Sequence, residues 1–530
     1  MISYKQQTLA KNWDAIVIGS GIGGLSAAAA LAKYAGRRVL VLERHYTAGG
    51  YTHTFHRPGY EWDVGVHYVG EMQTRGSAVR AAFDALTSGR LEWAPMPDVY
   101  DRMVIGGRRY DLPAGRERLR ERLKNYFPQE AQAIDHYLAA LHAARKAGMM
   151  YFAEKVLPRP LAKVAGGLMR APFLRWAGRT TREVLESITT NQELIGLLAG
   201  QWGDYGLPPA QSSFGIHAIV AGHYLEGASY PVGGAARIAA TMAPVIEGVG
   251  GQIAVNAEVA EIVVENGRAT GVRMADGVVL KAKLVISDAG ARNTFGRLLG
   301  GQKPDGCAGI EEELARIPPS MAHLSLYVGV QQSAADLGLS GTNVWVFPSA
   351  DHDGNLERFV RDPEAPFPLL FISFPSAKDP DFERRHPGRA TIEVVSMAPY
   401  EWFARWEDTR WKRRTEEYDA FKRRLAERLQ RELERIVPAV AGKIDHAELS
   451  TPLTTRHFMN YERGEAYGLA ATPERFRARS LRARTPVRSL FLTGQDVVSL
   501  GVAGALMGGL VCASAALGRA LIAKAARRAA

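Results

Sequence analysis

Cysteine is scarce in this sequence of 530 residues, which has only Cys307 and Cys512. Neither belongs to a CxxC pair, so the sequence contains no disulfide framework and no zinc-ligand spacing, although one disulfide could still join the two. A signal-peptide pattern is also missing, because residues 1–13 are polar and lack an apolar core. These absences favour a reducing compartment, and we expect a cytoplasmic protein.

Several classes of function lack their signatures. There is no P-loop and no Ser–His–Asp arrangement, and His217 and His223 have no carboxylate cluster near them in the sequence, so we predict no metal site. The net charge is +11, but the Lys and Arg residues are scattered and no nucleic-acid reader motif accompanies them. We therefore predict no nucleic-acid partner.

Long uncharged runs are few. Two of them, 15–32 and 497–518, approach the roughly 20 residues that a membrane-spanning helix needs and are apolar enough to be mistaken for one. Both are rich in Gly and Ala, and a glycine-rich turn interrupts the first. We therefore predict buried helices of a nucleotide-binding domain here, and no transmembrane helix.

Strand and helix signals alternate at the start of the chain. Apolar runs at 15–18 and 38–43 have strand length, and the Ala-rich segment 25–33 between them is typical of a helix. From about 77 to 224 the pattern is mostly helical, with prolines at 158, 160 and 172 expected to break it.

Alternating helix and strand signals return later in the chain. We expect a helix over about 235–249, and strands around hairpin turns at Asn266-Gly267 and Asp276-Gly277. Beyond these lie a strand-like run at 324–330 and a highly charged helix over about 402–437, whose mixed signs indicate a solvated face.

The pattern predicts an α/β fold: a Rossmann-like dinucleotide-binding domain assembled from three chain segments, with an interleaved α+β substrate domain. The predicted dinucleotide-binding segments are 1–76, 230–295 and 486–530. The predicted substrate segments are a helical cap over 77–229 and a further block over 296–485.

One glycine motif carries the functional interpretation. GSGIGG at 19–24 matches G-x-G-x-x-G, follows an apolar strand, opens an Ala-rich helix and is followed by an acid, Glu43, at the end of the next strand. Gly19 permits the tight turn, Gly21 lets the backbone approach a pyrophosphate, and Gly24 allows close packing of helix on strand. The helix amino terminus attracts phosphate, and Glu43 can accept hydrogen bonds from ribose hydroxyls.

Two further turns favour FAD over NAD. A second glycine turn, Ala48-Gly49-Gly50, follows Glu43 and is expected to lie near the cofactor. Near the other end of the chain, Thr493-Gly494-Gln495-Asp496 precedes a small-residue helix that begins near 501–504. A carboxylate there can meet a ribityl hydroxyl, and the helix amino terminus can face the pyrimidine edge of the flavin. A long ligand held at both ends fits FAD.

The chain resembles the FAD-dependent family of phytoene desaturases, carotenoid isomerases and all-trans-retinol 13,14-reductase (retinol saturase). The resemblance spans 14–511, and the pair His67-Tyr68 and the Gln495-Asp496 turn are most similar to the saturase and isomerase branch. The matching stretches are DAIVIGSGIGGLSAAAALA, VLVLERHYTAGGYTHTF, YEWDVGVHYVG, YPVGGAARIA, VISDAG and LFLTGQDVVSLGVAGALMGGLV.

The resemblance implies a long apolar polyene or related isoprenoid lipid as substrate, whose C=C bonds are reduced, formed or isomerised. It also implies contacts of the Val259 backbone with the adenine side. Together with the motifs, it gives the predicted FAD-binding set: Gly19, Ser20, Gly21, Gly23, Gly24, Glu43, Arg44, Gly49, Gly50, Tyr51, Thr52, Val259, Gly494, Asp496, Ala503 and Gly504.

Proton donors are less well defined. His67 and Tyr68 are the predicted catalytic pair, since either side chain could donate a proton to a substrate carbanion. His53 and the segment 463–468 are further candidates. Any of these could equally be a hydrogen-bonded core residue.

An electron partner is expected outside the chain. The glycines at 248–251 do not join a strand to a helix, so a second dinucleotide fingerprint is missing, and we predict an external electron donor or acceptor such as a quinone or oxygen. Two alternatives stay open: a flavin amine oxidase-like enzyme, and a non-catalytic prenyl-lipid carrier resembling the Rab GDP-dissociation inhibitors.

A peripheral membrane contact is also predicted. The segment 145–182 holds nine Lys or Arg residues and one acid, Glu154, interleaved with apolar residues that include Phe173 and Trp176. Such pieces can lie on an anionic bilayer surface and admit a lipid. An ordinary helical cap packed on the core explains the pattern as well.

Overall fold

The computed structural model describes residues 1–6, 9–74, 76–304 and 306–529. Its first sheet is mostly parallel and runs in the order β1-β11-β3-β2-β14-β13-β12, with β20 also paired to β14. The strands β14, β13 and β12 form an antiparallel extension at one edge. Their bounds are β1 Ile2–Ser3, β2 Asn12–Ile18, β3 Val39–Leu42, β11 Gln252–Val255, β12 Val259–Glu265, β13 Arg268–Met274, β14 Val279–Ser287 and β20 Leu490–Leu492.

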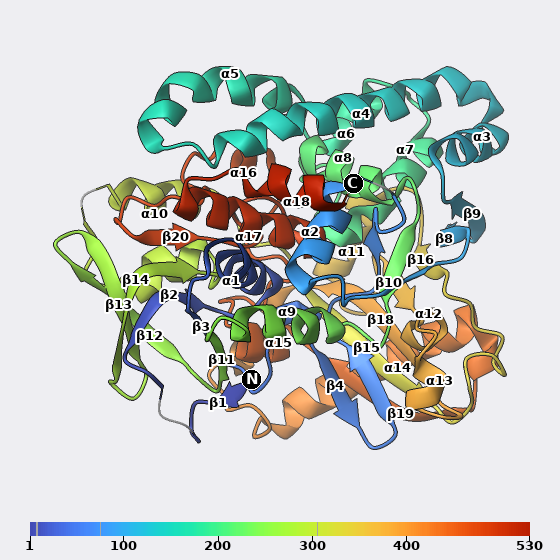
Figure 1. Cartoon of the computed structure of the whole chain (residues 1–530). Coiled ribbons are helices and arrows are strands. Elements are labelled where there is room, and N and C mark those ends of the chain that lie inside the picture. Colours follow the sequence, from blue (N-terminus) through green and yellow to red (C-terminus); the bar gives the residue numbers. More distant parts are fainter. Residues whose placement is uncertain (7–8, 75, 305, 530) are drawn as a thin grey trace.

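The helices of this part of the molecule come from distant segments of the chain. Helix α1 packs on both α9 and α17, and α2 packs on α18 (Figure 1). The fold class is therefore as predicted: the Rossmann-like sheet and its helices draw on the start, the middle and the end of the chain. The bounds are α1 Ile22–Ala35, α2 Ala78–Thr87, α9 Arg237–Glu247, α17 Gly501–Leu517 and α18 Leu521–Ala529.

Close backbone approach explains the small residues of α1 and α17. A Cβ atom on Gly24 would lie 2.2 Å from the carbonyl oxygen of Gly19, and one on Gly509 would lie 1.8 Å from Oγ of Ser26. Larger residues would push α1 off the strand–helix turn and off α17. The predicted role of Gly24 in helix–strand packing agrees with this geometry.

A second, mixed sheet forms the other half of the molecule, in the order β19-β15-β18-β17-β16-β8-β9. Its central strands β15 and β18 are almost entirely buried. The bounds are β8 Val99–Ile105, β9 Arg108–Pro113, β15 Ala322–Val330, β16 Asn343–Phe347, β17 Leu370–Ser373, β18 Ala390–Ala398 and β19 Ile444–Ser450. Seven of the described helices lie in the same stretch of the chain. Their bounds are α10 Ala308–Ala315, α11 His352–Arg361, α12 Pro375–Lys378, α13 Phe382–Arg385, α14 Glu416–Ile436, α15 Pro452–Met459 and α16 Pro473–Arg477.

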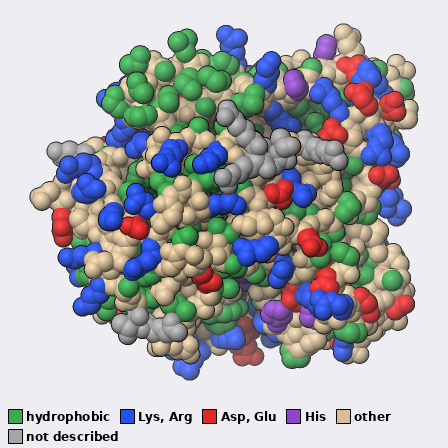
Figure 2. Space-filling view, in the orientation of Figure 1, with side chains coloured by type: hydrophobic (Ala, Val, Ile, Leu, Met, Phe, Trp, Pro, Cys, Tyr) green, Lys and Arg blue, Asp and Glu red, His purple; other side chains and the backbone are tan. Residues whose placement is uncertain are grey.

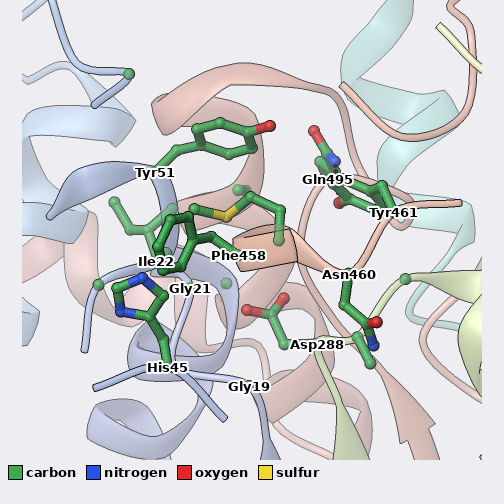
Figure 3. Close-up of a pocket in the computed structure, with 18 of the residues that line it drawn as sticks. Gly19, Gly21, Ile22, His45, Tyr51, Asp288, Phe458, Asn460, Tyr461 and Gln495 are labelled. Atoms are coloured by element: carbon green, nitrogen blue, oxygen red, sulfur yellow. Dashed lines mark hydrogen bonds between the residues drawn. The ribbon is translucent and has the colours of Figure 1, made fainter. Parts of the chain in front are cut away.

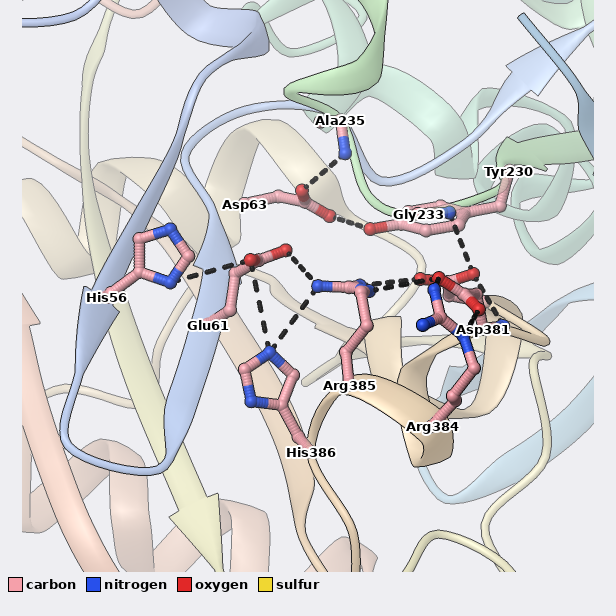
Figure 4. A network of polar contacts seen from close by, with 11 residues as sticks. His56, Glu61, Asp63, Tyr230, Gly233, Ala235, Asp381, Arg384, Arg385 and His386 are labelled. Carbon is pink, nitrogen blue, oxygen red and sulfur yellow. Dashed lines mark hydrogen bonds and ion pairs between the residues drawn. The ribbon is translucent and has the colours of Figure 1, made fainter.

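Two small sheets connect the halves: β4-β5, and β6-β10-β7. A polar network fixes the β4-β5 hairpin, since Arg385 bridges Glu61 and Asp379, and Asp379 accepts the backbone N–H of Gly233 (Figure 4). The strands are β4 Thr54–Arg57, β5 Tyr60–Asp63, β6 Val69–Gly70, β7 Trp93–Pro95 and β10 Ala228–Pro231.

A helical cap covers one side of the molecule, with α4 and α5 packed against each other along the top of Figure 1. Its helices are α3 Arg116–Tyr126, α4 Ala131–Glu154, α5 Arg159–Ala177, α6 Thr181–Glu186, α7 Gln192–Ala199 and α8 Phe214–Tyr224. None of the described helices is long and apolar enough to span a membrane.

The structure corrects several expectations. The stretch 77–224 is mostly helical, as expected, but it also contains β7, β8 and β9, and β8 pairs in parallel with the distant β16. Pro172 does not break a helix but lies inside α5. Because Leu168, four residues earlier, is 84% exposed, water can satisfy the carbonyl that loses its N–H partner.

Other corrections concern single residues. The charged helix begins only at Glu416, where the side chain of Thr415 caps it by accepting the N–H of Tyr418. Phe173 is fully buried and cannot touch a membrane. Cys307 and Cys512 are both free and buried, so no disulfide joins them.

Candidate functional site

A long cavity runs along the carboxyl-terminal ends of β2, β3 and β14 and reaches the second sheet. Twelve of the residues predicted from the sequence line it: Gly19, Gly21, Gly23, Glu43, Arg44, Gly49, Gly50, Tyr51, Thr52, His67, Val259 and Asp496. Ser20, Gly24, Gly494, Ala503 and Gly504 lie outside its lining, although Val502 and Ala505 of the same helix start line it. Figure 3 shows Gly19 and Gly21 with Tyr51, Tyr461 and Gln495 around this space.

The two amino-terminal glycine turns lie side by side, as expected. Gly21 and Gly49 form a bridge, and the N–H of Gly49 donates to the carbonyl of Ser20 at 3.1 Å. Helix α1 has no side-chain cap at Gly21, so the N–H groups of its first turn other than that of Gly24 can serve an anion.

Glu43 stands at the end of β3 in the cavity wall. Its Oε2 accepts from the N–H and the hydroxyl of Ser20, at 2.9 and 2.7 Å, and its Oε1 accepts from the N–H of His45 at 2.7 Å. These three donors hold the carboxylate in one orientation. Ser20 therefore supports Glu43 without lining the cavity.

Asp496 marks the carboxyl-terminal side of the cavity. Its Oδ2 accepts the N–H of Ala291 at 2.7 Å, whereas its Oδ1 is buried and has no hydrogen-bond partner among the described residues. The nearest cation, Arg475, is 3.8 Å away, and its guanidinium donates to the carbonyl of Gln495 at 2.6 Å. A buried acceptor without a donor fits a ligand hydroxyl, as FAD would supply.

Asp288 is a cavity residue that sequence reasoning missed. Its Oδ2 accepts the N–H of Gly24 at 2.8 Å, and burial raises its pKa to about 8. A neutral carboxyl group at the start of α1 would not repel a bound phosphate. In the sequence, Asp288 is marked only by its position at the end of an apolar run, in VISDAG. The pairing of β14 with β2 is what brings it to the glycine turn.

Gln495, from the turn singled out in the sequence, and several residues that the sequence did not indicate extend the wall at the far end. Gln495 donates to the hydroxyl of Tyr461 at 2.7 Å, and Asn460 and Phe458 lie beside them in the lining (Figure 3). No pattern in the sequence singles out Tyr461. It lies far from Gln495 in the chain and meets it only in the folded molecule.

The predicted catalytic pair separates. His67 lines the cavity, but Tyr68 does not, because its hydroxyl is engaged by Asp101 at 3.1 Å and by Asp204 at 2.9 Å in the adjoining core. Of the further candidates, His53 lines the cavity with Nδ1 2.5 Å from the carbonyl oxygen of Gly50, and Ala466 and Tyr467 of the segment 463–468 also line it.

The histidines judged unlike metal ligands have other partners. His217 lies between the hydroxyls of Tyr137 and Tyr205, and His223 accepts the N–H of Gly70 at 2.8 Å. Within the described ranges, no group of three or more His, Cys, Asp or Glu side chains could hold a metal ion.

A second cavity adjoins the first. The two share wall residues from the amino-terminal segment, from β15 and from α15: His45, Tyr51, His53, Val64, His323, Phe458 and Met459. The second cavity has a volume of about 670 Å³, and its lining includes Tyr46, Phe55, Tyr327 and Trp411. The aromatic part of this wall suits an apolar molecule. The lining also includes charged residues: Arg57, Lys412, Arg414, Asp419, Lys422 and Glu448.

Comparisons with known proteins agree with this architecture. Residues 17–86 match the family model of the NAD(P)-binding Rossmann-like domain. Wild-type putrescine oxidase shares the fold with a TM-score of 0.62 at 18% identity, covering 96% of this chain and 99% of that one.

Relatives that are similar in sequence identify the family more specifically than the shared fold does. The prolycopene isomerase of Arabidopsis thaliana is 27% identical over 95% of this chain and 83% of its own length. The all-trans-retinol 13,14-reductase of Danio rerio is 38% identical over 96% of this chain and 86% of its own length. The chain therefore belongs to the all-trans-retinol 13,14-reductase (retinol saturase) family, as its motifs had indicated.

Proposed function

We propose that this protein is an FAD-dependent oxidoreductase that acts on C=C bonds of an apolar polyene or isoprenoid lipid. The observation that carries this proposal is the single cavity that joins the 19–24 turn to Asp496 and adjoins a second cavity with aromatic side chains in its wall. The 13,14-reductase and prolycopene isomerase relatives, by their names, act on molecules of this kind.

The residues present fit FAD. The first N–H groups of α1 would hold the pyrophosphate, Glu43 the ribose hydroxyls, and the Val259 backbone the adenine side. The free Oδ1 of Asp496 would accept from a ribityl hydroxyl, and the start of α17 would face the pyrimidine edge. When bound, the flavin supplies hydride transfer, while the protein positions the substrate and excludes water.

We also propose that 1–76, 230–295 and 486–530 form the FAD-binding domain, and that 77–229 and 296–485 form the substrate domain. This assignment is supported by the strands and helices of the first sheet, which come from the three FAD-binding segments. Helix α2, which packs on α18, is the exception and lies just past the first boundary.

A reaction panel tests the function. The purified protein, photoreduced under argon, is incubated with retinoids, carotenoids and unsaturated fatty acids, and the products are weighed by mass spectrometry. Reduction adds two hydrogens, desaturation removes two, and isomerisation leaves the mass unchanged. A wild-type protein that changes none of the polyenes would overturn the proposal.

The amine oxidase alternative is supported by fold alone, since putrescine oxidase is only 18% identical. Release of hydrogen peroxide from an amine panel would favour it. We keep the polyene as the proposed substrate because the polyene-named relatives are the more similar in sequence.

We further propose peripheral contact with an anionic membrane through α4 and α5. Met149, Met150, Leu161, Val164 and Leu168 are between 53% and 85% exposed, and Figure 2 shows hydrophobic side chains gathered over α5. Lys146 and Lys163 are exposed on the same two helices, whereas Glu154 at the end of α4 is buried against Arg482. Exposed apolar residues beside Lys suit an anionic bilayer surface.

The electron partner is proposed to be external. The glycines at 248–251 link the end of α9 to the start of β11, a helix to a strand, so they lack the order of a dinucleotide fingerprint. Anaerobic mixing with NADPH should therefore bleach the flavin only slowly. Rapid bleaching of the flavin by NADPH would contradict the proposal that the electron partner is an external molecule of another class.

A further inference from the structure

His67 and Glu393 form a pair between the cavity and the core. Glu393 lies on β18 with its side chain fully buried, and its Oε2 is 2.8 Å from Nδ1 of His67. Its Oε1 accepts the N–H of Asp63 at 2.8 Å. The imidazole is 18% exposed, and because Nδ1 is buried against the carboxyl group, its accessible edge is the one that carries Nε2.

The contact between Nδ1 of His67 and Oε2 of Glu393 raises the question of which side chain carries the proton. Nδ1 and Oε2 are 2.8 Å apart, and neither atom has another partner in the part of the chain described. Burial lowers the pKa of His67 to about 3 and raises the pKa of Glu393 to about 8. Both shifts favour a protonated Glu393 whose Oε2 faces Nδ1, so the neutral imidazole carries its own proton on Nε2.

The surroundings hold both side chains in place. The His67 ring packs edge-on against Phe371 at 4.9 Å between centroids. Behind Glu393, Asp63 is held by the hydroxyl of Tyr230 and by the N–H of Ala235 at 3.0 Å (Figure 4). The pair is thus a rigid unit with a single edge open to the cavity.

We propose that His67 and Glu393 deliver the proton that saturation of a C=C bond requires, His67 as the catalytic acid and Glu393 as the positioning residue that reprotonates it. This inference rests on the proposed function. Saturation adds a hydride, which bound reduced flavin supplies, to one carbon and a proton to the other. The Nε2–H bond breaks, the electron pair of the substrate carbon forms the new C–H bond, and Glu393 transfers its proton to Nδ1.

The charge left on Glu393 has a nearby counter-ion. The ammonium group of Lys378 donates to Oγ of Ser373 at 2.7 Å and to the carbonyl of His67 at 2.9 Å, and its charge favours the ionised form of Glu393. Water must then restore the proton. The same pair run backwards would accept a proton during desaturation.

The titrating neighbours define the expected pH dependence. In the described part of the chain, three titratable groups face the pair: Lys378, with its pKa lowered to about 8, Asp63, with its pKa raised to about 8, and His323, with its pKa lowered to about 4, each chiefly by burial. His323 is therefore neutral throughout the working range. The turnover number should fall as pH rises through about 8, where Glu393 loses its proton.

Four variants test the proposal: His67→Gln, His67→Gly, Glu393→Gln and, as a control, His136→Gln on the exposed surface of α4. His67→Gln should lower kcat by roughly 10²- to 10⁴-fold with a small change in KM, and added imidazole should restore part of the activity of His67→Gly. Glu393→Gln should lower kcat and remove the fall near pH 8. His136→Gln should match the wild type.

A spectroscopic measurement accompanies the kinetics. With ¹⁵N-histidine labelling, and with His67→Gln to assign the signal, Nε2 of His67 should be protonated and Nδ1 should not. An unchanged kcat in His67→Gln, no rescue by imidazole, or a proton on Nδ1 would overturn the proposal while leaving wild-type turnover intact. A wild type without turnover of any polyene would overturn the proposed function and this inference together.

Discussion

The N–H of Gly24 donates a 2.8 Å hydrogen bond to Oδ2 of Asp288, which fastens the first turn of α1 to the end of β14. The bond puts an acidic side chain where a dinucleotide phosphate would be bound. Burial raises the pKa of Asp288 to about 8, so the group is neutral at pH 7. A neutral carboxyl group tolerates a nearby phosphate, whereas a carboxylate would repel it.

Affinity for FAD should therefore depend on pH through Asp288. In the wild type, the dissociation constant should be steady below about pH 7 and should rise above about pH 8, where the carboxyl group ionises. Asp288→Asn keeps an acceptor for the N–H of Gly24 and should remove the rise. Quenching of flavin fluorescence measures both, and parallel curves for the two proteins would contradict the prediction.

The free oxygen of Asp496 gives a second prediction. Asp496→Ala removes the unpaired Oδ1 and should weaken FAD binding by roughly 10- to 100-fold, the loss expected for a hydrogen bond to a charged group. Asp362, which caps the end of α11 far along the sequence, offers a matched Asp→Ala control that should bind FAD normally. Equal affinities of the two variants would contradict the assigned role.

Packing at the glycine turn gives a third prediction, which concerns stability. Gly24→Ala would place a Cβ 2.2 Å from the carbonyl oxygen of Gly19 and should lower the free energy of unfolding by about 1–3 kcal/mol. Gly167 lies in α5 with no atom within 4 Å of such a Cβ, so Gly167→Ala should raise stability by about 0.5–1 kcal/mol. Urea denaturation measures both, and a tolerated Gly24→Ala would contradict the packing argument.

Asp204 gives a prediction for stability against pH. Burial raises its pKa to about 8 in the folded chain, so between about pH 4 and 8 the folded state binds a proton that the unfolded state has released. That contribution to stability is present at low pH and is lost as pH rises. The free energy of unfolding of Asp204→Asn, relative to that of the wild type, should therefore rise by up to about 1.4 kcal/mol per pH unit in this window. Thermal unfolding at pH 5, 6, 7 and 8 checks this trend, which a constant difference would contradict.

The proposed membrane surface predicts a selective defect. The double variant Val164→Ser with Leu168→Ser removes two side chains that are 85% and 84% exposed, so it should reduce sedimentation with anionic vesicles without changing flavin content. Phe173 is unsuitable for this test because it is fully buried. Wild-type protein that stays in the supernatant with anionic vesicles would contradict the surface.

Local patterns in the sequence were enough for the α/β fold class, the family and the first glycine turn. The strand 15–18, the turn and the Ala-rich helix are contiguous, so their periodicity and glycine spacing predict both structure and ligand class. Glu43 follows in the next strand and is equally local. These parts of the interpretation need no knowledge of distant contacts.

Long-range pairing explains what the sequence could not indicate. Asp288 reaches the glycine turn only because β14 pairs with β2, and Glu393 reaches His67 only because β18 lies at the centre of the second sheet. The missed β8-β9 hairpin is a different case, because its Gly106-Gly107 turn is local and is a hairpin signal in the sequence itself. Tyr68 differs from its neighbour His67 because only one of the two side chains points into the cavity.

The central claim is that the 19–24 turn and Asp496 hold opposite ends of one FAD molecule. Flavin analysis of the purified protein after reconstitution with FAD tests it most directly, by visible absorbance and by chromatography of the released cofactor. We predict about one FAD per chain, with weaker retention when either Glu43 or Asp496 is changed to Ala. A colourless wild-type protein that binds no FAD would contradict the account.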